Sequence, residues 1–499
     1  MKKLLNKINL LLALLLVVSL AGAKEIVIYH TSDTHGHYYS KYAGWDEQNF
    51  DRKIGGYAVL KNLIDQEKNP YLLLDSGDFT RGSVEDDESK GKYAIEFMNK
   101  VGYDATVIGN HEFDYGIDNL KERLAMAKFD ILTSNIFNEK GKLPKHVKAY
   151  KIYNVDGIKI AVIGVGRGYK SLEKWQYKTA EEGIGSVIEK AKKKSDIVIV
   201  LAHSTVKRDD MMGDNNIDTS EKFKNEILVF FGGHYHAEVQ NYYYHKSWPM
   251  FVESGAYFYN VSKVVIDIDP KTKKVKKPRS ELIPLWVDVY GENEEIVAFG
   301  DKFRNKEADI IIGQAKTPIK KQPDLEAEPL FTSSPLGSFV SDIMREYAGT
   351  QIAIQNLGGV RADLGKGNIA YRDIYNIFPF PNTLAYMNVD GKFLKELFEY
   401  AVRDNGSWLQ ISGAEVVYKY ENNKAKDLEI FVDGKLVKPD DKFTLTTNDY
   451  IAKGGSEGKL FKNIENKVIT NTFVRDVIIN YIKNNKEVSA PKQGRIRMK

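Results

Sequence analysis

The sequence predicts an α/β protein of two domains with its chemistry at the ends of buried strands. Three observations support this. Short apolar strands alternate with helical segments from residue 24 to about 284, a second series of strands and helices follows residue 310, and polar side chains come directly after several strands. A chain of 499 residues is long enough for two to three domains.

The first series consists of continuous apolar strands with amphipathic segments between them. The expected strands are Glu25–Thr31, Tyr71–Asp75, Ala105–Ile108, Ile131–Thr133, Ile158–Val165, Ile197–Ala202, Leu228–Phe231 and Met250–Ser254. The expected helices are Gly56–Glu67, Lys92–Lys100, Asp118–Ala127 and Glu181–Lys194. Strands that are apolar throughout and flanked by helices indicate sheets that are covered on both faces.

The next segments suggest a hairpin, a connection and a second domain. Val261–Ile268 alternates as a half-buried strand does, and the basic run Lys271–Arg279 is interpreted as a solvated turn. Residues 292–309 are charged and helix-prone, so we expect a connecting helix between a domain of residues 24–291 and one of residues 310–499. The second domain is expected to hold helices at Pro335–Tyr347, Leu394–Arg403 and Val474–Ile482 and strands at Ile352–Gln355, Glu415–Tyr420, Leu428–Val432 and Phe443–Thr447.

Composition excludes several functional classes. The net charge is only +4, so no broad basic face is expected and nucleic acid is not a predicted partner. Cysteine is absent, which excludes disulfides, a thiol nucleophile and a lipid anchor on an N-terminal cysteine.

Residues 1–23 have the pattern of a signal peptide. A basic start is followed by the apolar run Leu10–Leu20 and the small residues Ala21–Ala23. The apolar run is short for a membrane span. We therefore expect export to the periplasm or the cell exterior, cleavage before Lys24 and no stable membrane anchor. The sequence leaves the oligomeric state open, with a monomer favoured.

The run from Thr106 to Asp114 is the most informative stretch. The strand that ends at Ile108 and Gly109 is followed at once by Asn110 and His111, with Asp114 three residues later. Open α/β sheets place ligand and catalytic groups at such strand ends. On its own, the run is also compatible with a capped loop.

Four other strand ends repeat this pattern. They carry Asp33 with His35, Asp78, His203, and His234 with His236. Five of the nine histidines of the chain lie in these motifs, which argues against a scattered structural origin. The other four, His30, His37, His146 and His245, are interpreted as structural or surface residues.

In this order, the motifs resemble those of calcineurin-like metallophosphoesterases. The whole chain is similar to the secreted bacterial 5′-nucleotidase / UDP-sugar hydrolase family, in which such a domain is joined to a C-terminal substrate-binding domain. The resemblance implies a four-layer metallophosphoesterase β-sandwich flanked by helices, a connecting helix and a smaller α/β domain. It also implies hydrolysis of nucleoside 5′-monophosphates, with UDP-sugars as a further substrate class, to nucleoside and phosphate by a metal-activated water.

The resemblance further implies a site for two divalent metal ions. Asp33, His35, Asp78 and His236 would hold one ion, and Asp78, Asn110, His203 and His234 would hold the other, with Asp78 as the bridge. A set of carboxylate, imidazole and amide ligands without thiolate suits zinc or manganese. His111 is then expected to stabilise the transition state and protonate the leaving oxygen, with Asp114 orienting its ring.

For the second domain, the resemblance implies four substrate contacts. Asn356 and Arg361 match a glycine-rich motif that contacts phosphate and base, and Phe380 and Tyr450 match two aromatic residues that stack on the base. Stacking tolerates any base, so the pair favours a nucleotide substrate without naming one. An alternative interpretation is that both aromatic residues belong to the core.

Three departures from the family leave the substrate open. The arginine expected near Thr332 is absent, Ser338 replaces an asparagine, and Ser456 replaces an aspartate that binds ribose hydroxyls. The alternatives are a 2′,3′-cyclic-nucleotide 2′-phosphodiesterase / 3′-nucleotidase, a related hydrolase with a non-nucleotide substrate, and a catalytically idle binding protein.

Overall fold

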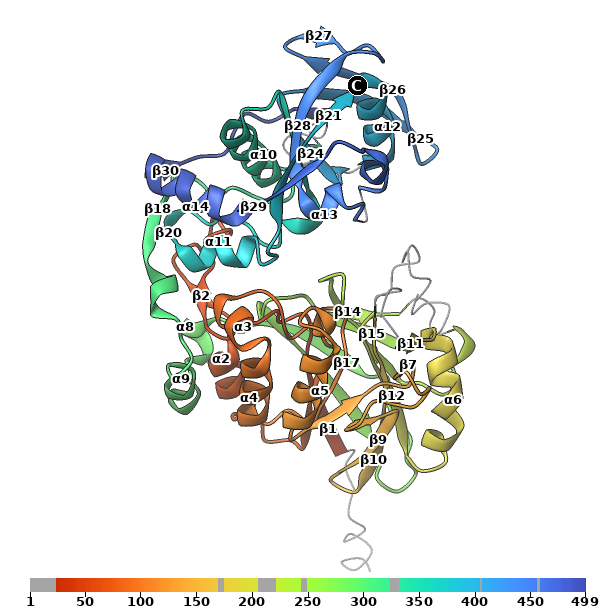
Figure 1. Ribbon diagram of the computed structural model, residues 1–499. Coiled ribbons are helices and arrows are strands. Elements are labelled where there is room, and N and C mark those ends of the chain that lie inside the picture. The colour runs from red at the N-terminus through yellow and green to blue at the C-terminus, as the bar shows by residue number, and fades with distance from the viewer. Residues whose placement is uncertain are drawn as a thin grey trace, which may run out of the picture. The chain divides into compact units, whose positions relative to one another are not determined.

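The computed structural model describes residues 24–168, 175–204, 221–243, 249–323, 330, 332–403, 406–455 and 458–499. The predicted signal peptide, His245 and Ser456 lie outside these residues. The chain forms two compact units (Figure 1). Unit 1 comprises residues up to Lys41, Ile54–Arg81 and Glu88–Phe303, and unit 2 comprises Tyr42–Lys53, Gly82–Asp87 and Arg304–Lys499. The predicted domain boundaries stay predictions.

Unit 1 is a sandwich of two sheets, which the described residues build from seven and six strands. In spatial order, the first sheet is β17 (Arg279–Pro284), β16 (Asn260–Ile268), β1 (Lys24–Thr31), β4 (Tyr71–Asp75), β5 (Ala105–Val107), β6 (Asp130–Leu132) and β8 (Val147–Lys148). The second is β14 (Glu238–Tyr242), β15 (Met250–Ser254), β13 (Val229–Phe231), β12 (Ile197–Ala202), β10 (Ile158–Val165) and β9 (Tyr150–Val155).

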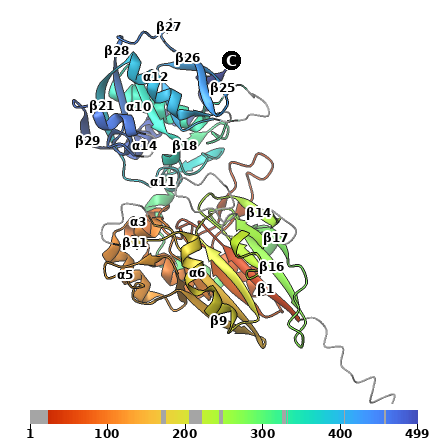
Figure 2. The same cartoon turned by 90° about the vertical axis from the view of Figure 1, so that its right-hand side faces the viewer.

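Alternation along β1 shows how the layers form. Ile26 and Ile28 face the second sheet in a shared core, whereas Val27 and Tyr29 face the helices on the other side. Those helices include α2 (Tyr57–Ile64), α4 (Lys92–Val101) and α9 (Glu294–Gly300), while α5 (Ile117–Met126) belongs to a smaller neighbouring cluster. The helix α6 (Ala180–Lys192) covers the outer face of the second sheet (Figure 2). The predicted four-layer arrangement is confirmed.

Unit 2 is built on a mixed sheet with helices on both faces. Its order is β24 (Leu409–Ser412), β19 (Ile352–Asn356), β28 (Lys442–Asn448), β21 (Thr383–Asp390) and β29 (Val468–Phe473). The helices α10 (Pro335–Ala348) and α14 (Val474–Asn485) pack on one face, and α12 (Gly391–Ala401) packs on the other. Smaller sheets join β20 (Gly367–Ala370), β18 (Ile311–Ala315) and β30 (Glu487–Val488), and β27 (Lys435–Leu436), β26 (Lys424–Val432), β25 (Glu415–Glu421) and β31 (Ile496–Met498).

Two helices differ from the sequence prediction. The expected connecting helix is shorter: α9 ends at Gly300, and a separate 3-10 helix covers Lys306–Asp309. Asn305 caps that second helix by accepting hydrogen bonds from two backbone N–H groups, which favours a new helix start over continuation. The helix α12 begins three residues earlier than predicted because Asp390 caps it, accepting from Phe393 N at 2.9 Å.

The basic segment Lys271–Arg279 connects β16 to β17, and its lysines are exposed or only partly covered. Among the described residues, no helix is both long and apolar enough to cross a bilayer.

Candidate metal centre and substrate domain

The predicted ligands of unit 1 come together at the carboxyl ends of parallel strands. Asp33 and His35 follow β1, Asp78 follows β4 and Asn110 follows β5. In the second sheet, His203 follows β12, and His234 and His236 follow β13. Adjacent parallel strands end at the same edge, so side chains far apart in sequence meet there.

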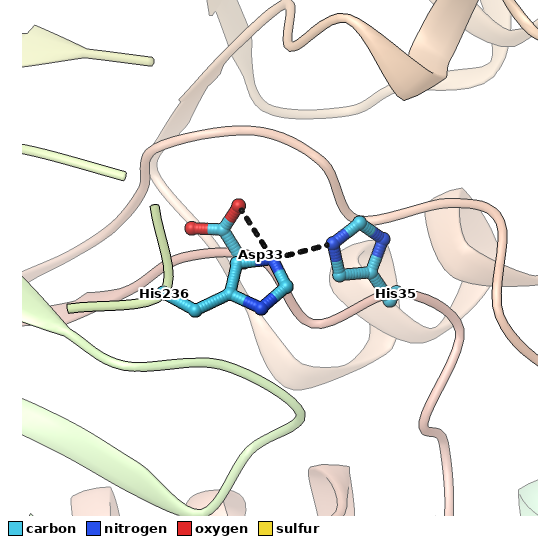
Figure 3. Close-up of side chains that lie close together, drawn as sticks. All are labelled: Asp33, His35 and His236. Atoms are coloured by element: carbon cyan, nitrogen blue, oxygen red, sulfur yellow. Dashed lines mark hydrogen bonds and ion pairs between the residues drawn. The ribbon is translucent and has the colours of Figure 1, made fainter. Parts of the chain in front are cut away.

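Two groups of possible metal ligands result. In the first, one ligand atom each from Asp33, His35 and His236 lies within 4.8 Å of the others (Figure 3). The Nε2 atoms of the two histidines lie 3.1 Å apart, and His236 Nε2 is 3.6 Å from Asp33 Oδ1. Asp78, His203 and His234 form the second group by the same measure.

Asp78 and Asn110 both approach His203. The Nε2 of His203 lies 3.0 Å from Asp78 Oδ2 and 3.3 Å from Asn110 Oδ1. Its Nδ1 lies 2.7 Å from the carbonyl of Ser76, which assigns the ring proton to Nδ1 and leaves Nε2 unprotonated in the neutral ring. His35 is oriented in the same way, because its Nδ1 faces the carbonyls of Thr80 at 3.2 Å and Arg81 at 3.1 Å.

The residues fit divalent ions. The Nδ1 atom of His234 is buried and has no hydrogen-bond partner within the described part of the chain, which is the state expected of an imidazole placed to bind a metal. Burial raises the pKa of Asp33 to about 7, and repulsion from Asp78 adds to this effect. A cation placed between these carboxylates would remove that repulsion.

Asp78 and His203 perturb each other. Burial opposes ionisation of Asp78, but the neighbouring His203 and His111 hold its pKa well below the usual range. Burial alone would lower the pKa of His203, but the Asp78 carboxylate raises it to about 9. The centre therefore holds buried charges of opposite sign, on Asp78 and His203, that stabilise each other.

The ligand loops have unusual backbone conformations. Asp33, His35, Asp78, His234 and His236 all have positive φ angles between 47° and 82°. Non-glycine residues rarely adopt this region, and such strain collects at functional sites. Gly109 matters for its missing side chain. A Cβ there would lie 2.2 Å from Asp78 Oδ1, so only glycine allows the two loops to approach.

His111 and Asp114 lie beside this centre as a pair. His111 Nδ1 is 2.8 Å from Asp114 Oδ2, so the proton between them belongs to Nδ1. The other ring nitrogen, Nε2, lies 3.9 Å from Asp78 Oδ2, and the ring centre is 5.2 Å from that of His35. The pair can therefore present one imidazole nitrogen to a group bound at the centre.

Several residues near the centre were missed by the sequence analysis. Glu112 is fully buried and accepts hydrogen bonds from the backbone N–H groups of Asp78, Thr80 and Gly109. The ring of Tyr257 packs against His35 and His236 at 5.6 and 5.1 Å. Glu112 stands inside the most informative motif and Tyr257 follows a strand end, so position in the pattern was the available signal.

Two of the histidines not assigned to the centre, His30 and His37, have structural surroundings. His30 lies within β1, where it is buried and its Nε2 is 2.8 Å from Ser76 Oγ. Burial lowers its pKa to about 3, which keeps it neutral. His37 is buried against the ring of Tyr257 at 4.8 Å.

In unit 2, Asn356 ends β19 and is buried, and its side-chain oxygen accepts from Asn448 Nδ2 at 2.8 Å. Arg361 lies with its guanidinium 5.9 Å from the ring centre of Phe380. Tyr450 is the second residue of the short helix α13 (Asp449–Ala452), is 42% exposed and lies against Gly455.

Two of the departures from the family pattern occupy buried positions. Thr332 is 1% exposed, and its hydroxyl donates to the carbonyl of Ile496 at 3.1 Å. Ser338 is also 1% exposed, on α10. Both positions are therefore occupied by small polar side chains that are packed inside unit 2.

Comparisons with known proteins agree with this geometry. Residues 26–238 match the calcineurin-like phosphoesterase family, and residues 311–463 match the 5′-nucleotidase C-terminal domain family. A 5′-nucleotidase from Vibrio vulnificus is 26% identical over 86% of this chain and 85% of its own length. Endonuclease YhcR from Bacillus subtilis is 27% identical over 94% of this chain, but the chain spans only 41% of that relative's length.

A solved structure shows the same fold. The 5′-nucleotidase precursor from Thermus thermophilus superposes with a TM-score of 0.79 over 95% of this chain and 99% of its own, at 22% identity. At that identity, the likeness supports the architecture alone.

Proposed function

We propose a substrate and a mechanism for this chain, which belongs to the calcineurin-like phosphoesterases that carry a 5′-nucleotidase C-terminal domain. It is a metal-dependent phosphoester hydrolase. Its proposed activity is that of a 5′-nucleotidase with two divalent ions, zinc or manganese, which releases phosphate from nucleoside 5′-monophosphates. The observation that carries this proposal is the pair of ligand groups, one of Asp33, His35 and His236 and one of Asp78, His203 and His234.

The chain's own residues have distinct roles in this mechanism. Asp33, His35 and His236 would hold one ion, and Asn110, His203 and His234 the other, with Asp78 between them. When bound, the ions supply Lewis-acid charge that binds the phosphoryl oxygens and promotes attack by water. Asp78 lies 3.0 Å from His203, so its carboxylate has a fixed direction before any ion arrives.

His111 serves as the proton donor to the leaving oxygen. Asp114 holds the proton on Nδ1, so Nε2 is the atom that carries the transferred proton and points toward the centre. A leaving nucleoside alkoxide is a strong base, and protonation by a positioned acid contributes about 10²–10⁴ in rate.

Unit 2 is proposed to select the nucleotide. Asn356 and Arg361 would contact its polar groups, and Phe380 and Tyr450 would contact the base. Support comes from the match to the 5′-nucleotidase C-terminal domain and from the exposure of Tyr450, which leaves its ring accessible. We further propose export of the mature chain from Lys24, supported by the composition of residues 1–23.

The test is phosphate release by the mature protein loaded with manganese or zinc. The substrates are AMP, 3′-AMP, 2′,3′-cyclic AMP, UDP-glucose and p-nitrophenyl phosphate, and single-stranded DNA is included because one relative is named an endonuclease. Preferred turnover of AMP that falls at least about 100-fold in His111→Ala supports the proposal. Turnover of the aryl phosphate alone, or of DNA alone, would refute the nucleotidase assignment.

The number of metal ions per chain is tested by a separate measurement. Two ions per chain by mass spectrometry of the loaded protein, and fewer in Asp78→Asn, are expected if Asp78 bridges. A single ion per chain in the active enzyme would contradict the two-metal proposal.

A further inference from the structure

Arg81 occupies an unusual position beside the His111–Asp114 pair. It lies three residues after Asp78, in the loop that follows β4, and its φ angle is +72°. Its side chain is only 10% exposed, and its Nε atom lies 3.7 Å from Asp114 Oδ2. That oxygen is also the one that lies 2.8 Å from His111 Nδ1.

The guanidinium is held from a second side by an aromatic ring. Its central carbon lies 5.1 Å from the ring centre of Tyr115, the residue that directly follows Asp114. A cation over an aromatic face is attracted by the ring, more strongly when both are shielded from water. The backbone of Arg81 has a separate contact, because its carbonyl lies 3.1 Å from His35 Nδ1.

We propose that Arg81 is a positioning residue for His111 and acts through the Asp114 carboxylate. A guanidinium stays charged at every pH at which the protein folds. It therefore holds the Asp114 carboxylate in one orientation, and that carboxylate holds the proton of His111 on Nδ1. This leaves Nε2 directed at the bound phosphoester. The inference deepens the proposed function, since it relies on His111 as the proton donor.

This role predicts a dependence on the leaving group. An alkyl phosphate such as AMP releases a strongly basic alkoxide and needs the proton, whereas p-nitrophenyl phosphate releases a stable phenolate and needs it little. Arg81→Met removes the charge and keeps the length of the side chain. We expect kcat for AMP to fall about 10- to 100-fold, KM to stay within about twofold, and aryl phosphate turnover to stay within about threefold.

A double-mutant cycle separates this role from a general structural one. If Arg81 acts through His111, then Arg81→Met has no further effect on AMP turnover in the His111→Ala background. Arg81→Lys, which keeps a cation but not the planar fork, should restore part of the rate. Arg279→Met is the matched control, because it removes an exposed guanidinium that pairs with Glu25 and Asp267 in the same unit.

Each variant is checked for unfolding midpoint and metal content, which should match the wild type. Equal losses on both esters, or fully additive losses in the double mutant, would overturn the proposal. So would an Arg81→Met chain that has lost its metals, because Arg81 would then support the ligand loop rather than His111.

A second readout does not depend on catalysis. In protein labelled with 15N at histidine, the His111 signals are assigned by their loss in His111→Ala. At a pH where the His111 ring is neutral, wild type should show Nδ1 protonated and Nε2 unprotonated, and Arg81→Met should show a mixture of tautomers; the proton that the ring transfers is the second one, which Nε2 carries when the ring is a cation. An unchanged tautomer in Arg81→Met would refute the inference. If the wild type hydrolysed no phosphomonoester but the tautomer shifted, the proposed function would fail and the positioning role would stand.

Discussion

Glu112 allows the sharpest test of how the ligand loops are held. Its Oε2 accepts from the backbone N–H groups of Asp78 at 2.9 Å and Gly109 at 2.7 Å. Its Oε1 accepts from Thr80 N at 3.2 Å and Thr80 Oγ1 at 3.1 Å. One buried carboxylate thus joins the loop after β4 to the loop after β5, and both loops carry proposed ligands.

The substitution Glu112→Gln keeps the shape and replaces one acceptor oxygen with a donor NH₂. If the NH₂ turns toward Asp78 and Gly109, two backbone hydrogen bonds are lost. If it turns toward Thr80, one is lost, because the hydroxyl can then accept while it donates to the His111 carbonyl at 3.2 Å. The second orientation costs less. One lost hydrogen bond to a charged group and the weakening of two others sum to about 2–4 kcal/mol of unfolding free energy.

The assay is urea unfolding followed by circular dichroism, with and without manganese, together with the metal content of the loaded protein. We expect a lower midpoint for Glu112→Gln and weaker metal retention, since the Asp78 loop loses its anchor. The control is Glu122→Gln, whose side chain is 61% exposed and pairs with Lys92 on the surface. The reasoning is refuted if Glu112→Gln unfolds within about 0.5 kcal/mol of the wild type and retains all its metal.

Three further predictions concern stability. Burial would raise the pKa of Glu67, but hydrogen bonds from Lys263, Asn69 and Tyr29 lower it from 4.5 to about 2; its stabilisation is therefore present above pH 4.5 and is lost as the pH falls toward 2. Glu67→Gln should reduce the unfolding free energy that is lost between pH 4.5 and about 2 by about 1–3 kcal/mol. Thermal unfolding across this pH range measures the loss, and an unchanged loss would contradict the prediction. In unit 2, Glu85 is fully buried 3.0 Å from Arg372, so Glu85→Ala should cost about 3 kcal/mol in urea unfolding, whereas a cost below about 1 kcal/mol would mean that the pair is not coupled. Chelation of the loaded protein should lower its unfolding free energy by about 4 kcal/mol for each ion that is present at about 1,000 times its dissociation constant, and an unchanged melting temperature would argue against structural coupling of the metal.

The layers, and the meeting of the polar side chains that follow the strands, could be predicted because each depends on a local pattern. Alternation in β1 separates Ile26 from Val27, and a polar residue after a parallel strand must lie at the common edge of the sheet. Asp33 and Asp78 were found in this way although they lie far apart in the sequence. A polar residue that follows a parallel strand can be recognised without knowing which side chain it will meet.

The supporting residues could not be predicted because their meaning depends on partners in three dimensions. Glu112 stands inside the most informative motif, but its role depends on a hydrogen bond from Asp78, 34 residues away. Arg81 stands three residues from a predicted ligand, but its contact with Asp114 exists only once two loops meet. The connecting helix is shorter than predicted for another reason: charge and helix propensity extend past Gly300, while the Asn305 cap decides where the next turn starts.

The same loops explain how strained ligands persist before metal binds. The loop after β1 is held to the loop after β4 by three successive backbone hydrogen bonds, from Asp33 N to Gly77 O at 2.9 Å, His35 N to Asp78 O at 3.0 Å and Gly36 N to Phe79 O at 3.0 Å. Because these bonds tie the two loops together, Asp33, His35 and Asp78 cannot leave their left-handed conformations one at a time. The ligand groups are therefore positioned by main-chain contacts that most side-chain substitutions leave intact. It follows that a ligand substitution such as His35→Ala should remove metal binding with little change in the loop, whereas a change at Gly77 or Gly109 should disturb both loops at once.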